Sequence, residues 1–303
     1  MQPQDHCDRI LQVIKPFSEE FVNVDGNIPH PGRRPKCSDL NLMALCLLQE
    51  SLDLASERRF FDFLEQHLPY LARSIGTREN FNARKRRLAP YMEKIRRLIV
   101  HKLNKQYDSN VYIIDSMPLQ ICRNARAKRC KILRSSSPNA DPSFGYCASQ
   151  QQFYFGFRFH CVCSAMGGIE HYDLSPAHIH DINFLHDIKD IFSNCVLVGD
   201  KGYRCTPWRL TLSEYAGIEL CVPSKSNERL QYSMPDDYAR IRKRIEVLFS
   251  QLVDQMNIRK NYAKSQVGFF SRIISKVTLL TLLQFINASN HHSLNHIRYT
   301  LAA

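Results

Sequence analysis

The chain has 303 residues, 44% of them hydrophobic, and its 41 Lys and Arg outnumber its 29 Asp and Glu to give a formal net charge of +12. This length and apolar content allow one sizeable core and a smaller second one, which excludes a tail or a scaffold. The positive charge indicates a polyanionic partner, nucleic acid first. No apolar run reaches the ~20 residues that span a bilayer, and the N-terminus is unlike a signal peptide, so we expect a soluble, cytoplasmic protein.

Residues 1 to about 105 have helical periodicity. Ser38 is a suitable N-cap for the apolar run that follows it, and Thr77 can cap a long helix with apolar positions from Phe81 to Ile99. Near the start of that helix lies a basic block, which we define as Arg84, Lys85, Arg86 and Arg87. We expect this block to project toward DNA, as in a helix-turn-helix-like domain, with a solvated helix face as the alternative. The predicted DNA-binding domain covers residues 1–108.

From residue 110 the pattern changes to alternating strands and helices. The apolar run VYII ends on Asp115, and the run CVLVG ends on Asp200. Between them, a long basic connection over residues 116–152 leads to the alternating stretch FYFGFRFHCVCSA, and Met166-Gly167-Gly168 predicts a hairpin turn. Basic residues of the connection are expected to contact nucleic acid, namely Arg123, Arg126, Lys128, Arg129 and Lys131.

The remaining elements complete the predicted domain. A helix is expected near residues 181–192, another after Pro207, a strand at 218–222 and a final helix from about residue 236. The order strand, strand, strand, helix, strand, helix, strand, helix is typical of a ribonuclease H-like α/β domain, with a mixed sheet flanked by helices. We therefore predict such a domain over residues 109–303, with a basic, helical C-terminal extension.

Three carboxylates are candidates for one metal site. Buried strands deliver Asp115 and Asp200 to the carboxyl edge of the sheet, where ligands bind in α/β folds. Glu246 adjoins Ile245 at the margin of the apolar face of the last helix, and its alternative role is an i,i+4 ion pair with Arg242. Two Mg²⁺ ions held by such carboxylates can activate a nucleophile and neutralise a phosphate during phosphodiester cleavage.

The segments YIIDSMPL, YFGFRFH, LSPAHIHD, LVGDKGY and RKRIEVLFSQL together resemble the DDE transposases of bacterial insertion sequences, especially the insertion-sequence family numbered nine-eighty-two. The resemblance covers nearly the whole chain. It implies that Asp115, Asp200 and Glu246 are catalytic and bind Mg²⁺ or Mn²⁺, two ions during catalysis. It also implies DNA partners (terminal inverted repeats and target DNA), a homodimer or larger assembly on DNA, no membrane, and a bacterial cytoplasmic location at the nucleoid.

Further residues near the predicted site are candidates for contact with the DNA or for structural roles. Lys201 and Tyr203 are predicted phosphate neighbours, and Arg242 matches a basic residue that related families place before the glutamate. Ala239 and Val253 stand where those families have a Tyr and a basic residue, which leaves Tyr238 and Arg259 as possible substitutes. His160 and His180 are expected in core or capping roles. The competing functions are a non-mobile nuclease on the same fold and a DNA-binding regulator without catalysis.

Overall fold

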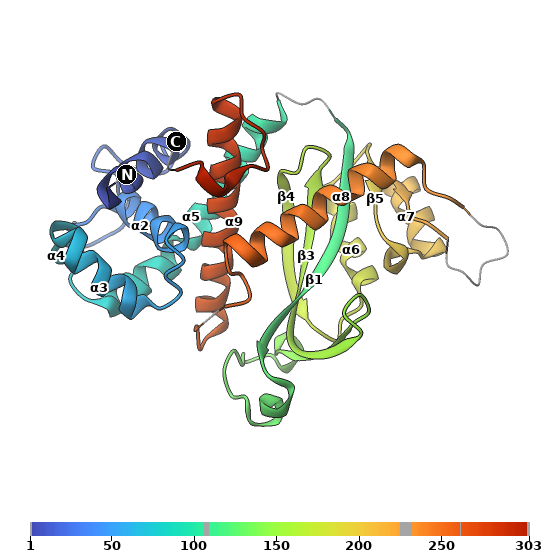
Figure 1. Ribbon diagram of the computed structural model, residues 1–303, viewed down its shortest axis with the longest axis horizontal. Helices are drawn as coiled ribbons and strands as arrows, with labels where there is room; N and C mark the ends of the chain where they lie inside the picture. The colour runs from blue at the N-terminus through green and yellow to red at the C-terminus, as the bar shows by residue number, and fades with distance from the viewer. Residues whose placement is uncertain (1, 106–108, 225–231, 261, 302–303) are drawn as a thin grey trace. The chain divides into compact units, whose positions relative to one another are not determined.

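The computed structural model describes residues 2–105, 109–224, 232–260 and 262–301. The chain forms two compact units (Figure 1): a helical unit of residues 1–103 and 251–303, and a sheet unit of residues 104–250. Residues 251–303, which were predicted to extend the catalytic domain, therefore pack with the N-terminal helices. The predicted boundary at residue 108 lies outside the described residues, and the division into functional domains stays a prediction.

The helical unit is built from both ends of the chain. Ser38 and Thr77 cap helices as predicted, since their hydroxyls accept hydrogen bonds from the backbone N–H of Asn41 at 3.1 Å and of Asn80 at 3.2 Å. The α-helices are α1 (Pro3–Ile14), α2 (Asp39–Ser51), α3 (Glu57–His67), α4 (Pro69–Ile75), α5 (Arg78–Asn104) and α9 (Gln266–Ser289). Shorter turns are η1 (Lys15–Phe17), η6 (Gln251–Gln255) and η7 (Ile297–Tyr299).

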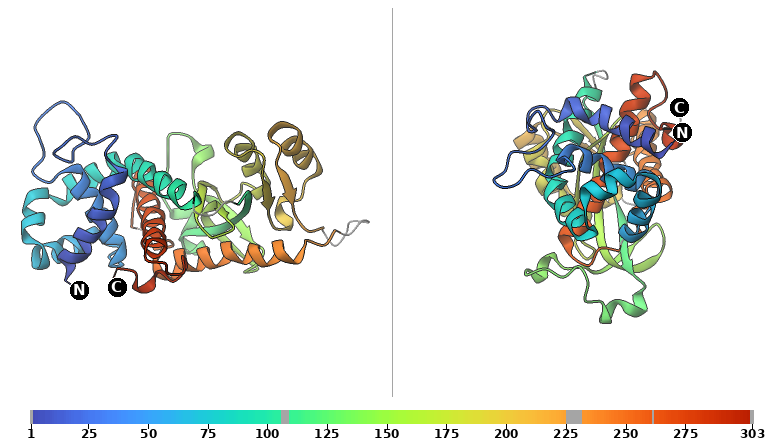
Figure 2. Two further views of the ribbon diagram at one scale, coloured as in Figure 1. Left: turned by 90° about the horizontal axis from the view of Figure 1, so that it is seen from above. Right: turned by 90° about the vertical axis from the view of Figure 1, so that its left-hand side faces the viewer.

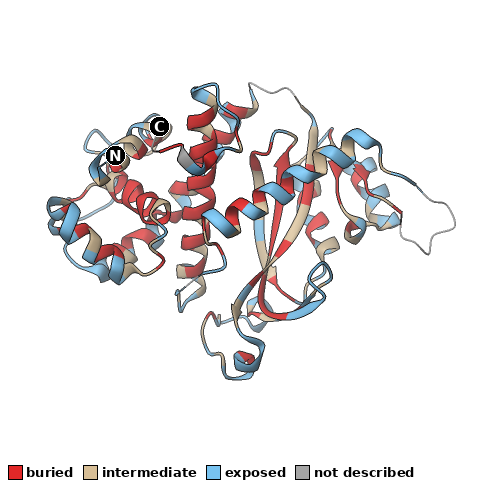
Figure 3. Cartoon of the chain, in the orientation of Figure 1, coloured by how far each residue is buried: buried red, intermediate tan, exposed pale blue. Residues whose placement is uncertain are grey.

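Helix α9 runs through the core of the helical unit. It is long and apolar enough to cross a membrane by length and composition, but 83% of its most apolar window is buried inside the protein (Figure 3). Burial to this extent is the pattern of a core helix, in which an all-round apolar surface is covered by other helices.

A buried charge cluster joins α9 to α2 and α5. The carboxylate of Glu50, on α2, lies 2.9 Å from the guanidinium of Arg272, 2.7 Å from the ammonium of Lys276 and 3.4 Å from that of Lys85. All four side chains are buried. Burial alone would raise the pKa of Glu50, but the three cations outweigh it and hold that pKa below its usual value.

The sheet unit contains one mixed sheet. Its strand order is β2-β3-β1-β5-β6, with β4 paired to β3; β1 is antiparallel to β3 and parallel to β5. The strands are β1 (Val111–Cys122), β2 (Ser143–Cys147), β3 (Gln152–Ser164), β4 (Ile169–Pro176), β5 (Val196–Val198) and β6 (Glu219–Cys221). The helices are α6 (Leu185–Ile191), α7 (Thr206–Ala216) and α8 (Asp236–Ser250), with short helices η2 (Asn124–Arg129), η3 (Pro138–Ala140), η4 (Asp181–Phe184) and η5 (Lys201–Tyr203).

Helices cover both faces of this sheet (Figure 2). On one face, Ile114 and Leu197 pack into a core with Leu185 of α6 and Leu212 of α7. The opposite face of β1 packs against α8. A mixed sheet between two helical layers is the ribonuclease H-like arrangement that the order of elements predicted.

Two features of the sheet differ from the sequence prediction. Strand β1 continues through Asp115 to Cys122, because β3 pairs with it along that whole length. Its parallel neighbour β5 pairs with it only as far as Ile113, so Asp115 lies where β5 ends and not where β1 ends. The second difference is β2, a short strand inside the predicted connection, which pairs with the start of β3.

Candidate active site and nucleic-acid surfaces

Asp115 and Asp200 lie side by side at the carboxyl end of β5. Ile113 of β1 pairs with Val198 of β5, and the two aspartates follow these residues by two positions each. Because side chains alternate along a strand, Asp115 lies on the same face of the sheet as Ile113. The backbone is extended at Asp200, so the side chain of Asp200 lies on the face of Val198, which is the same face. We call these two residues the acidic pair.

The electrostatics of the acidic pair disfavour two negative charges. The pKa of Asp115 is raised to about 7, mainly by burial and also by the nearby carboxylates of Asp200 and Asp181, against the opposing effects of the Ser116 N–H and of Arg242. The Ser116 N–H donates to Asp115 at 2.7 Å, and the Gly202 N–H donates to Asp200 at 2.8 Å, which fixes one oxygen of each carboxylate. A divalent cation between these side chains would relieve their repulsion, so the donor set fits a hard metal ion.

Glu246 lies on the helix that covers the acidic pair. Phe159 is two residues before Cys161, the partner of Asp115 in β3, and its ring contacts Phe249 of α8 at 6.3 Å between centroids. Helix α8 therefore covers the face that carries Asp115. Glu246 follows the buried Ile245, is 54% exposed, and forms the ion pair with Arg242 at 3.1 Å.

Arg242 connects the third candidate carboxylate to the acidic pair. Its guanidinium pairs with Glu246 and also lowers the pKa of Asp115. Among the residues that the structure describes, no three His, Cys, Asp or Glu side chains form a ready metal-binding group. The structure thus brings Asp115 and Asp200 together, while the metal-ligand role of Glu246 stays a prediction.

Asp181 is an acidic residue near the site that was not predicted as part of it. It accepts a hydrogen bond from the hydroxyl of Ser116 and forms an ion pair with Arg158. Ser116 adjoins Asp115 in β1, so Asp181 supports the strand from the opposite face of the sheet. The signal in the sequence was only its place at a helix start after a strand, which is also where ordinary capping residues occur.

The two histidines have the structural roles expected of them. His160 is buried and stacks on Phe184, and its Nε2 lies 2.8 Å from the hydroxyl of Ser175. Burial lowers the pKa of His160 to about 4, which keeps it neutral. His180 caps η4, where its ring nitrogen accepts from the Ile182 N–H at 3.3 Å.

Of the two predicted phosphate neighbours after Asp200, one is exposed and one is buried. Lys201 is exposed at the start of η5. Tyr203 is fully buried in the core beneath the acidic pair, so the prediction that it contacts DNA is wrong. The ring of Tyr203 packs against Gly199, just after β5, so the aromatic residue three positions after Asp200 belongs to the core.

The family comparison agrees with this geometry. Residues 106–282, more than half of the chain, match the model of the transposase DDE domain. The chain belongs to the DDE transposases. No curated protein matches the transposase. Membership makes DNA its partner and divalent metal ions its usual cofactor, and the matched segment contains both the acidic pair and Glu246.

The basic block on α5 does not project as a whole. Arg84 and Lys85 are buried: Arg84 pairs with Asp39 at 2.7 Å, and Lys85 belongs to the charge cluster around Glu50. The expectation that these two side chains reach DNA is therefore wrong. Arg86 is exposed, and Arg87 pairs with Asp39 but remains 42% exposed. DNA contact by Arg86 and Arg87 stays a prediction.

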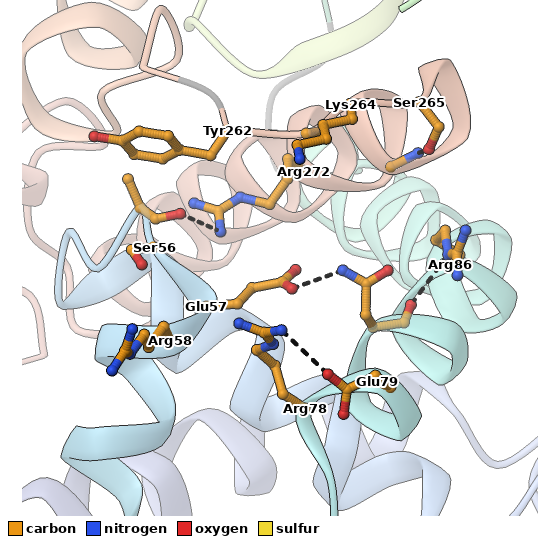
Figure 4. A pocket seen from close by; sticks show the side chains of 14 residues that line it. Ser56, Glu57, Arg58, Arg78, Glu79, Arg86, Tyr262, Lys264, Ser265 and Arg272 are labelled. Carbon is orange, nitrogen blue, oxygen red and sulfur yellow. Dashed lines mark hydrogen bonds and ion pairs between the residues drawn. The ribbon is translucent and has the colours of Figure 1, made fainter. Parts of the chain in front are cut away.

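Arg86 lines a cavity of about 690 Å³ in the helical unit (Figure 4). The starts of α3, α5 and α9 form its walls, and Glu57 accepts a hydrogen bond from Asn82 at 2.6 Å inside it. Five basic residues line the cavity against two acidic ones: Arg58, Arg78, Arg86, Lys264 and Arg272 against Glu57 and Glu79. The lining of this cavity is therefore net positive, which would favour an anionic group beside Arg86.

The predicted basic connection of the sheet unit is a solvent-exposed segment. We define the basic segment as residues 123–134; it includes η2 and the turn that follows it. Its five predicted DNA-binding residues are all exposed, and in the described parts of the chain none of them forms an ion pair: Arg123, Arg126, Lys128, Arg129 and Lys131. Their contact with nucleic acid stays a prediction, now with accessible side chains.

Proposed function

We propose that the transposase cleaves DNA strands at the ends of an insertion sequence and joins them to target DNA in a metal-dependent reaction. The observation that carries this proposal is the acidic pair, placed by two parallel strands on the face that α8 covers. Family membership supports it, because the matched segment spans all three acidic residues. The proposed roles are metal ligands for Asp115, Asp200 and Glu246.

The surrounding residues would prepare the site for an anionic substrate. When bound, two divalent cations supply an activated nucleophile and neutralise charge on the phosphodiester. Without them, Asp115 holds a proton up to about neutral pH, since burial raises its pKa to about 7. Arg242 holds Glu246 in an ion pair, and its release would make both a carboxylate and a phosphate-binding guanidinium available. Lys201, exposed beside Asp200, would contact the substrate backbone.

A set of isosteric substitutions tests this assignment. Asp115→Asn, Asp200→Asn and Glu246→Gln should each abolish Mg²⁺-dependent cleavage of DNA that flanks the gene, while binding of that DNA in Ca²⁺ persists. The matched control is Asp187→Asn, which removes an exposed carboxylate on α6, away from the acidic pair in the sequence. Full cleavage by any two of the three variants would show that these residues are not the catalytic carboxylates.

The products discriminate between transposition and simple nuclease activity. A transposase joins the released 3′ ends to a second DNA, whereas a nuclease of the same fold leaves only cut ends. Joining of two ends requires two acidic sites held together, so we infer a homodimer or larger assembly on paired ends. Light scattering with paired end DNA measures this directly, and joining of both ends by a monomeric complex would contradict it.

A further inference from the structure

Three large aromatic side chains are exposed together on the β2–β3 hairpin. Phe144 and Tyr146 of β2 and Phe153 of β3 are 46%, 47% and 63% exposed. Phe144 and Tyr146 are two residues apart and therefore on one face of β2, and Tyr146 pairs directly with Phe153, with ring centroids 5.0 Å apart. We call these three residues the aromatic platform. Exposed aromatic rings on an edge strand favour aggregation, so their grouping calls for a functional partner.

The rest of the hairpin holds the aromatic platform rigidly. Phe144 packs edge-on against the buried Phe155 at 5.1 Å between centroids. Gly145 lies directly against the backbone of Ala177, where a side chain would clash. The rings are thus presented by a paired strand with a close-packed reverse side, and little conformational entropy is lost when a partner stacks on them.

The basic segment adjoins the aromatic platform. The side-chain amide of Asn124, the first residue of η2, donates to the backbone carbonyl of Phe153 at 2.7 Å. The guanidinium of Arg134 lies 6.0 Å from the ring centre of Phe155. Between Asp115 and Asp141 the sequence contains no acidic residue. Phosphates are therefore attracted to the same surface that exposes the rings.

We propose that the aromatic platform stacks on unpaired bases of single-stranded DNA while the basic segment holds the adjoining phosphates. Aromatic rings beside a basic groove are the pattern by which proteins bind single strands without sequence preference. Bases inside a duplex are already stacked on each other and present no free face to Tyr146 or Phe153. The site would hold the strand that becomes unpaired next to a cleaved or distorted end. The proposal depends on DNA being the partner, but not on the assignment of the catalytic carboxylates.

The register of the sheet sets the distance between this site and the acidic pair. Asp115 pairs with Cys161, and Phe153 lies eight residues earlier on β3. At about 3.3 Å per residue, the platform is at most about 26 Å from Asp115 along the strand. This length corresponds to about eight stacked nucleotides at 3.4 Å each. A single strand of about eight nucleotides is therefore long enough to reach from the platform to the acidic pair.

Binding of a 20-nucleotide oligo(dT) and of a 20-base-pair duplex, each measured by fluorescence anisotropy in EDTA, tests the proposal. The Tyr146→Leu/Phe153→Leu variant keeps the apolar bulk but removes the rings; Tyr146→Phe/Phe153→Tyr keeps the rings. The control is Tyr215→Leu, a residue 74% exposed on α7 of the same unit. We expect the leucine pair to weaken oligo(dT) binding by at least about fivefold and duplex binding by less than about twofold, with the other two variants near wild type.

Three results would overturn the proposal. The first is unchanged oligo(dT) affinity in the leucine pair, and the second is an equal loss on oligo(dT) and duplex. The third is a change in oligomeric state of the leucine pair in light scattering, because the platform would then be a contact between two copies of the chain. Oligo(dT) binding in EDTA is measured without cleavage, so the result for the leucine pair tests only this proposal, whereas loss of Mg²⁺-dependent cleavage in Asp115→Asn tests only the catalytic assignment.

Discussion

Replacing Glu50 by Gln should destabilise the helical unit strongly, although the two side chains have nearly the same shape. The substitution removes the one negative charge that Arg272, Lys276 and Lys85 share in a buried position. Loss of one partner from a buried ion pair costs about 3–5 kcal/mol, because a charge is left without compensation. Folded domains have only about 5–15 kcal/mol in total, so this is a large fraction.

The structure places the expected loss near the lower end of that range. Each cation keeps one neutral acceptor after the change: Lys85 has the side chain of Gln49 at 3.0 Å, Arg272 the carbonyl of Ala55 at 3.2 Å, and Lys276 the carbonyl of Met256. We therefore expect about 3 kcal/mol at pH 7. The folded pKa of Glu50 is below its ordinary value of 4.5, so its stabilisation is present above that pH and is lost as pH falls through the folded pKa. The difference between wild type and Glu50→Gln should shrink accordingly in acid.

Urea unfolding followed by two probes measures the effect. Far-ultraviolet circular dichroism reports mainly on helices, and fluorescence of Trp208, the single tryptophan, reports on the sheet unit. A loss of 3 kcal/mol should lower the dichroism midpoint by roughly 1–3 M urea while the Trp208 transition stays in place. The control is Glu65→Gln, an exposed position on α3, which should change stability by less than about 0.5 kcal/mol. A loss below about 1 kcal/mol in Glu50→Gln would refute the charge argument.

The exposed and buried halves of the basic block should have different effects when mutated. Arg86→Ala/Arg87→Ala should weaken duplex binding with little change in melting temperature, whereas Arg84→Ala/Lys85→Ala should lower the melting temperature by several degrees. The reverse pattern would contradict the observed burial. Gly156→Ala should destabilise the sheet unit by about 1–3 kcal/mol in urea titrations, because its Cβ would collide with the carbonyl oxygen of Leu119 in the neighbouring strand. Asp115→Asn should stabilise the protein at pH 8 in EDTA. The folded pKa of Asp115 is about 7, above its ordinary value of 3.8, so ionisation of this carboxyl lowers stability as the pH rises from about 4 to 7, and Asn removes that loss. An unchanged melting temperature in Asp115→Asn would argue against the burial of a charge at this position.

The sheet and its acidic pair were predictable because their signals are local. Asp115 and Asp200 each follow a run of apolar residues that only a buried strand accommodates, and the hairpin turn at Gly167 adopts the positive φ of 96° that glycine permits. Strand β2 was missed because its five residues alternate without a continuous apolar run and stand in a polar connection. The full length of β1 is set by pairing with β3, which a single strand's sequence does not reveal.

The burial of Arg84 and Lys85 shows what a charge count leaves out. Both residues lie three and four positions after Phe81, and therefore on the apolar face of α5 with Leu88 and Met92. Their spacing was a sign of burial that their charge concealed. Their partners, Asp39 and Glu50, are 45 and 35 residues away, so the compensation depends on tertiary packing. Glu246 is the opposite case, because periodicity placed it at the margin of a buried face, where it is found.

The participation of α9 in the helical unit has a consequence for synthesis of the chain. Glu50 leaves the ribosome 222 residues before Arg272, its guanidinium partner. At a translation rate of about 5–20 residues per second, α9 is synthesised roughly 10–40 s after the first five helices, whose core it completes. During that interval the sheet unit can fold, but the N-terminal helices lack α9 and cannot form their complete core. A fragment of residues 1–108 should therefore be poorly folded, and the helical unit should reach its native fold only when translation is nearly finished.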